Sequence, residues 1–250
     1  MELLGIDVGG TGIKGGIVDS DKGKMVGERF RLDTPRPATP ESVTDTVAQV
    51  VKHFNWKSSV GAGFPAVVRH GVVHTAANID QSWIGCDVNS MFAGATGCSF
   101  SVRNDADVAG MAEMRYGAGR NCDGVVLVLT LGTGIGSSLF TDGKLVPNTE
   151  FGHIEISGRP AERRTADSVR TRKKLSWKKW AERVDDYLHR LDFYLWPDLI
   201  IIGGGVSRKH ERFLPLLTVT TKIVPAMLRN DAGIIGAACA SIGESEQSNH

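Results

Sequence analysis

The feature that most constrains the fold is a glycine-rich turn that occurs twice, each time between two apolar segments. The first turn contains Gly9, Gly10, Thr11 and Gly12, and the second contains Gly132, Thr133 and Gly134. The flanking segments span residues 1–8, 13–19, 125–131 and 135–140. Glycine lets backbone N–H groups approach an anion closely, so a glycine bend between two strands predicts a phosphate-binding β-hairpin. The repetition predicts two similar α/β lobes with a cleft between them.

Residues 10–15 also match G-x-G-x-x-G, which in dinucleotide-binding proteins opens a helix that receives the pyrophosphate. Here the next residues, 16–19, lead into a turn and a third strand at 25–32, without a helical period or cap. The sequence therefore predicts a hairpin and excludes the dinucleotide fold. The two hairpins together predict a grip on a phosphate chain.

Two charged residues flank the first turn. Asp7 ends the first strand, where a carboxylate can hold a hydrated Mg²⁺ beside phosphates, because Mg²⁺ keeps its waters and takes few protein ligands. Lys14 lies on the hairpin and supplies a cation for the donor phosphates.

The remaining elements follow from caps and periodicity. Thr39 and Pro40 begin a helix, and residues 100–103 form a strand that runs into a helix at Asn104. An amphipathic helix is expected at 177–195. Further strands are expected at 60–64, 72–75 and 199–202, and a small-residue helix at 234–242, followed by a frayed polar tail at 244–250. We predict one lobe at 1–108, joined by the C-terminal helix at 234–250, and a second at 109–233.

Composition and spacing narrow the class of protein. Lys and Arg number 29 against 28 acids, so the net charge of +1 predicts no polyanionic partner except through a local patch. The four cysteines form no CxxC pair, which predicts neither a disulfide framework nor a zinc site. No signal segment or membrane-length apolar run is present, so we expect a cytoplasmic protein without membrane contact.

Five motifs together resemble the ROK sugar kinases. They are residues 7–14, 104–107, 131–136, 150–155 and 203–205, in the order typical of that family, and the likeness covers nearly the whole chain. Further stretches resemble the polyphosphate glucokinases and polyphosphate/ATP glucomannokinases of the family. These stretches are residues 75–78, 82–85, 147–153, 196–198 and 205–209. The resemblance implies an actin-like ATPase (ribonuclease H-like) fold, a sugar site in the interlobe cleft, phosphoryl transfer to a sugar 6-hydroxyl and a homodimer.

Asp105, where a strand gives way to a helix, is the expected acceptor of the hydroxyl proton. Asp is also a favoured helix N-cap, and the resemblance decides for catalysis, leaving Asp107 as the structural acid. Carboxylate, amide and imidazole groups suit the recognition of sugar hydroxyls. The expected sugar residues are Asn78, Asn104, Asp105, Glu150, His153 and Glu155.

Gly204 and Gly205 resemble the adenosine-side loop of the family, although a tight strand-to-helix turn explains them equally. The chain departs from the family after His153, where many members carry a cysteine-rich zinc motif and this one has no cysteine before Cys239. His153 is therefore expected to contact the sugar.

Residues 159–179 contain nine cations and two acids. A solvated helix face and a track for inorganic polyphosphate both remain open for this stretch. Nucleic acid is a poor alternative, because Trp177 and Trp180 fit the apolar face of a helix. The sequence thus predicts a Mg²⁺-dependent hexokinase that uses polyphosphate, and also ATP, to phosphorylate glucose or mannose. An ATP-only ROK glucokinase is the runner-up, followed by a sugar-binding sensor.

Overall fold

The computed structural model describes residues 1–77 and 79–242, which divide into two compact units. Unit 1 contains Met1–Ala112 and the chain from Asp231 onward, and unit 2 contains Glu113–Asn230. The boundary expected at 108–109 falls inside a helix, α3 (Asp105–Tyr116), and the units divide four residues later, as the boundaries 108 and 112 show. Asn78 and the expected polar tail at 244–250 lie outside the described residues.

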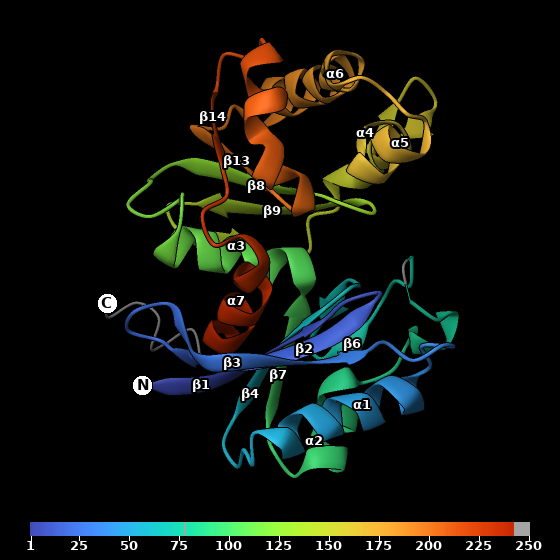
Figure 1. The fold of residues 1–250 in the computed structure, drawn as a ribbon, viewed down its shortest axis with the longest axis vertical. Coiled ribbons are helices and arrows are strands. Elements are labelled where there is room, and N and C mark those ends of the chain that lie inside the picture. Colours follow the sequence, from blue (N-terminus) through green and yellow to red (C-terminus); the bar gives the residue numbers. More distant parts are fainter. Residues whose placement is uncertain (78, 243–250) are drawn as a thin grey trace. The chain divides into compact units, whose positions relative to one another are not determined.

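Unit 1 is built on a five-stranded mixed sheet (Figure 1). Its strands, in spatial order, are β3 (Lys24–Asp33), β2 (Gly12–Asp19), β1 (Glu2–Val8), β4 (Val60–Phe64) and β7 (Phe100–Asn104). The first three are antiparallel neighbours, whereas β1, β4 and β7 run parallel. Because β1 and β2 form a hairpin, the prediction that excluded the dinucleotide fold is confirmed.

Helices cover the two faces of this sheet. The helices α1 (Pro40–His53) and α2 (Val88–Thr96) lie on one face, and α7 (Ala232–Ala240) lies on the other against β1 and β4 (Figure 1). The backbone of α7 is so close to the sheet that a Cβ on Gly61 would lie 1.6 Å from the carbonyl oxygen of Ala237. Shorter elements complete the unit: β5 (Val68–Arg69), β6 (Val72–Val73) and η1 (Gln81–Trp83).

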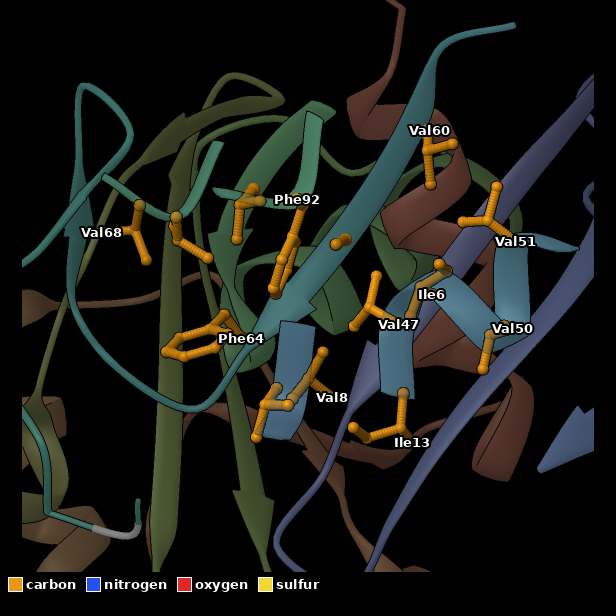
Figure 2. Close-up of a cluster of buried hydrophobic side chains, with 14 of the residues drawn as sticks. Ile6, Val8, Ile13, Val47, Val50, Val51, Val60, Phe64, Val68 and Phe92 are labelled. Atoms are coloured by element: carbon orange, nitrogen blue, oxygen red, sulfur yellow. The ribbon is translucent and has the colours of Figure 1, made fainter. Parts of the chain in front are cut away.

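The larger core of unit 1 lies between the sheet and α1 and α2. Figure 2 shows Ile6, Val8 and Ile13 of the sheet facing Val47 and Val50 of α1. The helix contributes residues spaced by three and four, which puts them on one face. Phe64, Trp83 and Phe92 form an aromatic cluster next to them, with the rings of Phe64 and Trp83 4.7 Å apart.

Unit 2 repeats the plan of unit 1. Its sheet has the order β10-β9-β8-β13-β14, with β8, β9 and β10 antiparallel and β8, β13 and β14 parallel. The expectation of two variants of one plan is therefore confirmed. The strands are β8 (Val125–Leu131), β9 (Ile135–Thr141), β10 (Lys144–Val146), β13 (Leu199–Gly203) and β14 (Lys222–Pro225).

The amphipathic helix is present as predicted, as α6 (Trp177–Leu195), with the Ser176 side chain accepting from the Lys179 N–H as its cap. The basic stretch, however, is not one helix. It divides into β12 (Arg159–Pro160), α4 (Glu162–Thr165), α5 (Asp167–Arg172) and the start of α6. The remaining elements are β11 (Glu155–Ile156), η2 (Phe151–His153), η3 (Gly205–Arg212), η4 (Leu214–Leu216) and η5 (Arg229–Asp231).

A buried carboxylate lies where the chain enters unit 2. Glu113, 2% exposed, accepts hydrogen bonds from the backbone N–H groups of Ala118, Met227 and Leu228 at 2.8–3.1 Å. It thereby joins the end of α3 to the segment that precedes α7. Within residues 1–77 and 79–242, no helix has the length and apolar character needed to cross a membrane.

Candidate functional site

The first glycine turn closes on itself and leaves donors exposed. The Gly9 N–H donates to the Gly12 carbonyl at 3.1 Å, and the Thr34 hydroxyl donates to the Gly9 carbonyl at 2.5 Å. Within the described residues, the N–H groups of Gly10 and Thr11 have no acceptor. Both residues are exposed, so the turn presents two backbone donors to an anion.

A row of charged residues crosses the sheet beside this turn. Asp7 of β1 is paired with Lys14 of β2, and Lys14 with Arg31 of β3, so all three project from one face. The Lys14 ammonium lies 3.1 Å from the Asp7 carboxylate. The Arg31 guanidinium donates to the Thr11 carbonyl at 2.7 Å and contacts Asp33 at 2.8 Å. Sequence reasoning missed Arg31, although the strand register at 25–32 could have placed it next to Lys14.

A cavity of 270 Å³ opens next to the first turn. Gly9 and Gly10 line it together with Pro65, Ala77 and Asp80. Thus the turn, the end of β4 and the segment around residue 79 enclose one space in unit 1.

The second glycine turn, in unit 2, has the same internal closure. The Gly132 N–H donates to the Gly134 carbonyl at 3.0 Å, and the N–H groups of Thr133 and Gly134 have no acceptor among the residues that the structure describes. Gly204 adjoins this turn, because a Cβ on it would lie 2.5 Å from the carbonyl oxygen of Leu131. Its φ of +79° also favours glycine.

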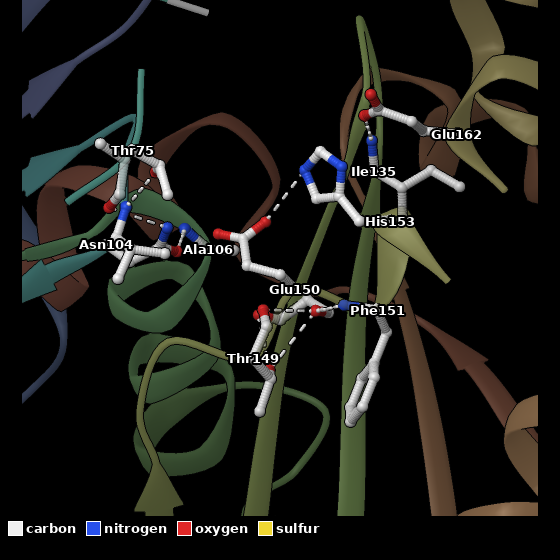
Figure 3. Close-up of polar contacts among 12 residues, drawn as sticks. Thr75, Asn104, Ala106, Ile135, Thr149, Glu150, Phe151, His153 and Glu162 are labelled. Atoms are coloured by element: carbon white, nitrogen blue, oxygen red, sulfur yellow. Dashed lines mark hydrogen bonds and ion pairs between the residues drawn. The ribbon is translucent and has the colours of Figure 1, made fainter. Parts of the chain in front are cut away.

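Asn104 ends β7 (Figure 3), and Asp105 begins α3 in unit 1. The Asn104 side-chain oxygen accepts from the N–H groups of Ala106 at 2.8 Å and Asp107 at 3.2 Å, and its amide donates to the Ala66 carbonyl at 3.1 Å. Asn104, 6% exposed, is therefore the helix cap. This role, considered for Asp105 from the sequence, belongs to its neighbour, while Asp105 is half-buried.

Glu150 and His153 lie together in unit 2. Phe151–His153 is a 3₁₀ turn, and residues three apart eclipse each other in such a turn. The His153 Nε2 atom consequently lies 3.4 Å from the Glu150 carboxylate (Figure 3). Glu155 is exposed on β11 and makes no polar side-chain contact with this pair among the described residues.

Glu162 of α4 contacts the second glycine turn, a position that the sequence did not indicate. Its carboxylate accepts the Ile135 N–H at 3.4 Å and lies 2.5 Å from the position of a Cβ on Gly134 (Figure 3). Burial raises the pKa of Glu150 while His153 opposes the shift, and the charge of Glu162 raises that pKa further. The two carboxylates are thus close enough to interact. Glu162 is one of only two acids among the nine cations of residues 159–179. This unusual position was the one feature of the sequence that could have drawn attention to it.

Among the residues that the structure describes, no group of three or more His, Cys, Asp or Glu side chains could hold a metal ion. The described residues thus contain no set of side chains that could bind a metal ion by protein ligands alone. Asp7 still supplies the single carboxylate on which a hydrated Mg²⁺ bound to phosphates can rest.

Comparison with known proteins places the chain in a family. The family model for the ROK family matches residues 3–168. The chain belongs to the ROK family. A polyphosphate glucokinase from Mycobacterium tuberculosis (strain CDC 1551 / Oshkosh) is 52% identical to it over 242 residues, which cover 96% of this chain and 91% of that protein. A polyphosphate glucokinase from Mycobacterium leprae (strain TN) is 50% identical, covering 96% and 75%.

Solved ROK structures share the fold. The inorganic polyphosphate/ATP-glucomannokinase from Arthrobacter sp. strain KM superposes with a TM-score of 0.93 at 51% identity, covering 96% of this chain and 98% of that one. A ROK family glucokinase from Streptomyces griseus, in complex with glucose and AMPPNP, gives a TM-score of 0.81 at 24% identity, covering 96% and 98%. The two-sheet α/β architecture is the actin-like ATPase fold of ROK sugar kinases, as the resemblance implied.

Proposed function

We propose that this ROK protein transfers the terminal phosphoryl group of inorganic polyphosphate, and also of ATP, to the 6-hydroxyl of glucose, with mannose as a second substrate. The observation that carries the proposal is the 52% identity to a polyphosphate glucokinase over 96% of the chain. The 51% identity to a polyphosphate/ATP-glucomannokinase supports the second donor and the second sugar.

Asp105 is the proposed base. As the sugar oxygen forms its bond to the terminal phosphorus, the bond from that phosphorus to the bridging oxygen breaks. The hydroxyl proton passes to the Asp105 carboxylate, and the shortened polyphosphate, or ADP, leaves. The β7–α3 junction suits this role, because Asn104 caps the helix with its side-chain oxygen and the half-buried Asp105 carboxylate accepts the Ala106 N–H at 2.8 Å. Asn104 itself has three polar contacts in unit 1 and is proposed chiefly to position Asp105.

The phosphate donor is assigned to the two glycine turns and to Gly204 and Gly205. The N–H groups of Gly10, Thr11, Thr133 and Gly134 are available for phosphate oxygens. Lys14 and Arg31 add positive charge, and Asp7 would hold Mg²⁺ through water. When bound, Mg²⁺ neutralises charge that develops on the transferred group.

The sugar is assigned to Glu150, His153 and Glu162, with Asn78 and Glu155 as further predicted contacts. Carboxylates accept hydrogen bonds from hydroxyls, and an imidazole both accepts and donates. Burial, and to a smaller extent the charge of Glu162, raise the pKa of Glu150, so hydrogen bonds donated by sugar hydroxyls would stabilise its charged form. The family resemblance further predicts a homodimer, which light scattering on purified protein tests.

Glucose phosphorylation with Mg²⁺, measured separately with long-chain polyphosphate and with ATP, tests the proposal. Activity with polyphosphate is expected, and Asp105→Asn should reduce kcat by about 10²–10⁴-fold because proton acceptance is lost. A thermal melt of the variant checks that it is folded. Activity with ATP alone would reject polyphosphate as donor, and inactivity with both donors across several hexoses would reject the kinase assignment.

A further inference from the structure

Two glycine loops of unit 2 lie at the carboxyl ends of neighbouring parallel strands. Gly203 of β13 pairs with Thr130 of β8, and Gly204 packs against Leu131, the residue before the second glycine turn. These loops form the unit 2 part of the proposed donor site. The segments that leave these loops are therefore the parts of unit 2 that a donor chain longer than the site can reach.

Each loop is followed by a basic segment. On one side η3 begins at Gly205 and carries Arg208, Lys209 and Arg212. On the other side Ser168 of α5 donates to the carbonyls of Gly132 at 3.1 Å and Thr133 at 2.7 Å, which anchors α5 to the second turn. The chain then exposes five cations: Arg172, Lys173, Lys174, Lys178 and Lys179.

The two basic segments meet at Trp177. The Arg170 guanidinium lies 4.1 Å from the centre of this ring and that of Arg212 lies 5.8 Å from it. The ring also stacks on Phe213, with centroids 6.2 Å apart and an interplanar angle of 13°. Trp177 therefore joins α5, α6 and η3 into one surface. We call it the basic surface: Arg172, Lys173, Lys174, Lys178, Lys179, Arg208, Lys209 and Arg212.

Apart from Arg212, whose guanidinium lies over the Trp177 ring, the cations of the basic surface make no charged contact that holds the fold together in the described part of the chain. None of its eight cations forms an ion pair within the part of the chain that the structure describes, whereas Arg164 pairs with Asp186 and Arg170 with Asp167. Lys178 and Lys179 stand in the first turn of α6, where the helix dipole favours acids. The helix α1 follows that rule with Glu41. Helix stability thus does not explain these two lysines.

We infer that the basic surface binds the part of a long inorganic polyphosphate chain that extends beyond the donor site, so that the protein prefers long chains to short ones. This inference rests on the proposed function. It also extends the sequence hypothesis, because η3 adds a second segment and Trp177 connects the two. Polyphosphate repeats a negative charge at every phosphate, which suits a set of exposed Lys and Arg side chains that form no ion pairs within the described residues. A nucleotide carries too short a phosphate chain to use such a surface.

Two double variants and one control test the inference: Lys173→Gln/Lys174→Gln, Arg208→Gln/Lys209→Gln and Lys144→Gln. Lys144 is an exposed cation of β10 in the same unit and serves as the control. Binding of long-chain polyphosphate is titrated without sugar at several salt concentrations, and KM is measured for long-chain polyphosphate and for triphosphate. Each double variant should weaken long-chain binding roughly tenfold and lower the salt slope by about one per lost contact, whereas the control keeps wild-type values. Thermal melts check folding.

The outcomes separate the two proposals. If the wild-type protein uses polyphosphate but the double variants bind long chains as tightly as it does, the inference is wrong and the proposed function stands. If the wild type phosphorylates no sugar, the proposed function fails, and the titration still tests the surface. Equal competition by single-stranded DNA of matched charge would overturn the assignment to polyphosphate.

Discussion

At the scale of single residues, neighbours at the β7–α3 junction have different tasks. Asn104 uses its oxygen to cap α3 and its amide to bind the Ala66 carbonyl, while the carboxylate of Asp105 is the proposed base. Asn104→Ala should lower the free energy of unfolding by about 2 kcal/mol, because the cap is lost and a buried carbonyl loses its donor. Urea unfolding measures this.

Asn104→Asp provides the comparison for that measurement. It keeps an oxygen at the N-terminus of α3 and loses only the donor to Ala66. It should therefore cost less than Asn104→Ala. If both variants lowered the free energy of unfolding equally, the cap at residue 104 would contribute nothing to stability.

Glu150 should make stability depend on pH. Its pKa in the folded protein is raised, chiefly by burial, above the ordinary value of 4.5. Between these two values the folded protein keeps a proton that the unfolded chain has lost, so stability falls as pH rises through that window. Glu150→Gln should remove this fall, and its melting temperature should exceed that of the wild type more at about pH 8 than at about pH 4.

Melting curves of Glu150→Gln and of Glu155→Gln, an exposed carboxylate on β11, test that expectation. The Glu155 variant should follow the wild type at both pH values. A Glu150 variant that is less stable than the wild type at both would refute the argument.

The sequence indicated candidate residues that stand next to a recognisable local pattern, such as the end of a strand. It did not indicate residues whose contacts are made with segments distant in the sequence. Asp7, Asn104 and the glycine turns stand at strand ends, which local patterns reveal. Arg31 reaches the first turn across a strand pairing, and Glu162 reaches Gly134 from a helix that begins 28 residues later, as their positions 134 and 162 show. Such contacts are not visible without the fold.

At the scale of elements, the packing of α7 on unit 1 depends on glycine. A Cβ on Gly236 would lie 1.6 Å from the carbonyl oxygen of Val108, a backbone atom that cannot move aside easily. Gly236→Ala should therefore destabilise the protein by about 3 kcal/mol or more through overpacking.

Gly94→Ala is the matched control, because Gly94 lies in the interior of α2 with open space around its Cβ position. It should stabilise by about 0.5 kcal/mol, since alanine loses less backbone entropy in a helix. Urea unfolding of both variants gives the comparison. Similar effects would mean that the close approach of α7 is not needed.

Strong periodicity made the long helices and strands predictable from the sequence. The short helices could not be predicted in this way. The helix at 177–195 and the strands at 60–64 and 125–131 have the expected bounds, because the helix buries one continuous face and the two apolar strands are buried along most of their length. The basic stretch could not be subdivided, since four-residue and six-residue helices such as α4 and α5 are fixed by tertiary contacts. The Trp180 indole N–H on the Thr165 carbonyl at 2.8 Å is one such contact.

At the scale of the whole molecule, the chain passes from unit 1 to unit 2 and back. Glu113 stands at the first passage and binds the Met227 and Leu228 N–H groups shortly before the second. Glu113→Gln should cost about 3 kcal/mol, because the amide cannot accept on both sides and leaves a buried N–H unpaired. Glu182→Gln, exposed on α6, should stay within about 0.5 kcal/mol of the wild type. Thermal unfolding of both variants tests whether the Glu113 carboxylate stabilises the protein. Equal melting temperatures of the two variants would contradict this role.

The position of α7 has a consequence for biosynthesis. Unit 1 begins with β1, yet the helix that covers the second face of its sheet is Ala232–Ala240, so all of unit 2 is synthesised in between. At usual translation rates, roughly 10–45 s separate these two elements on the ribosome. During that interval the small-residue face of the nascent sheet lacks α7, while unit 2 already has its whole sequence. Unit 1 is therefore translated before unit 2 but completes its fold after it. Chaperones that bind nascent apolar surface should bind unit 1 during this interval.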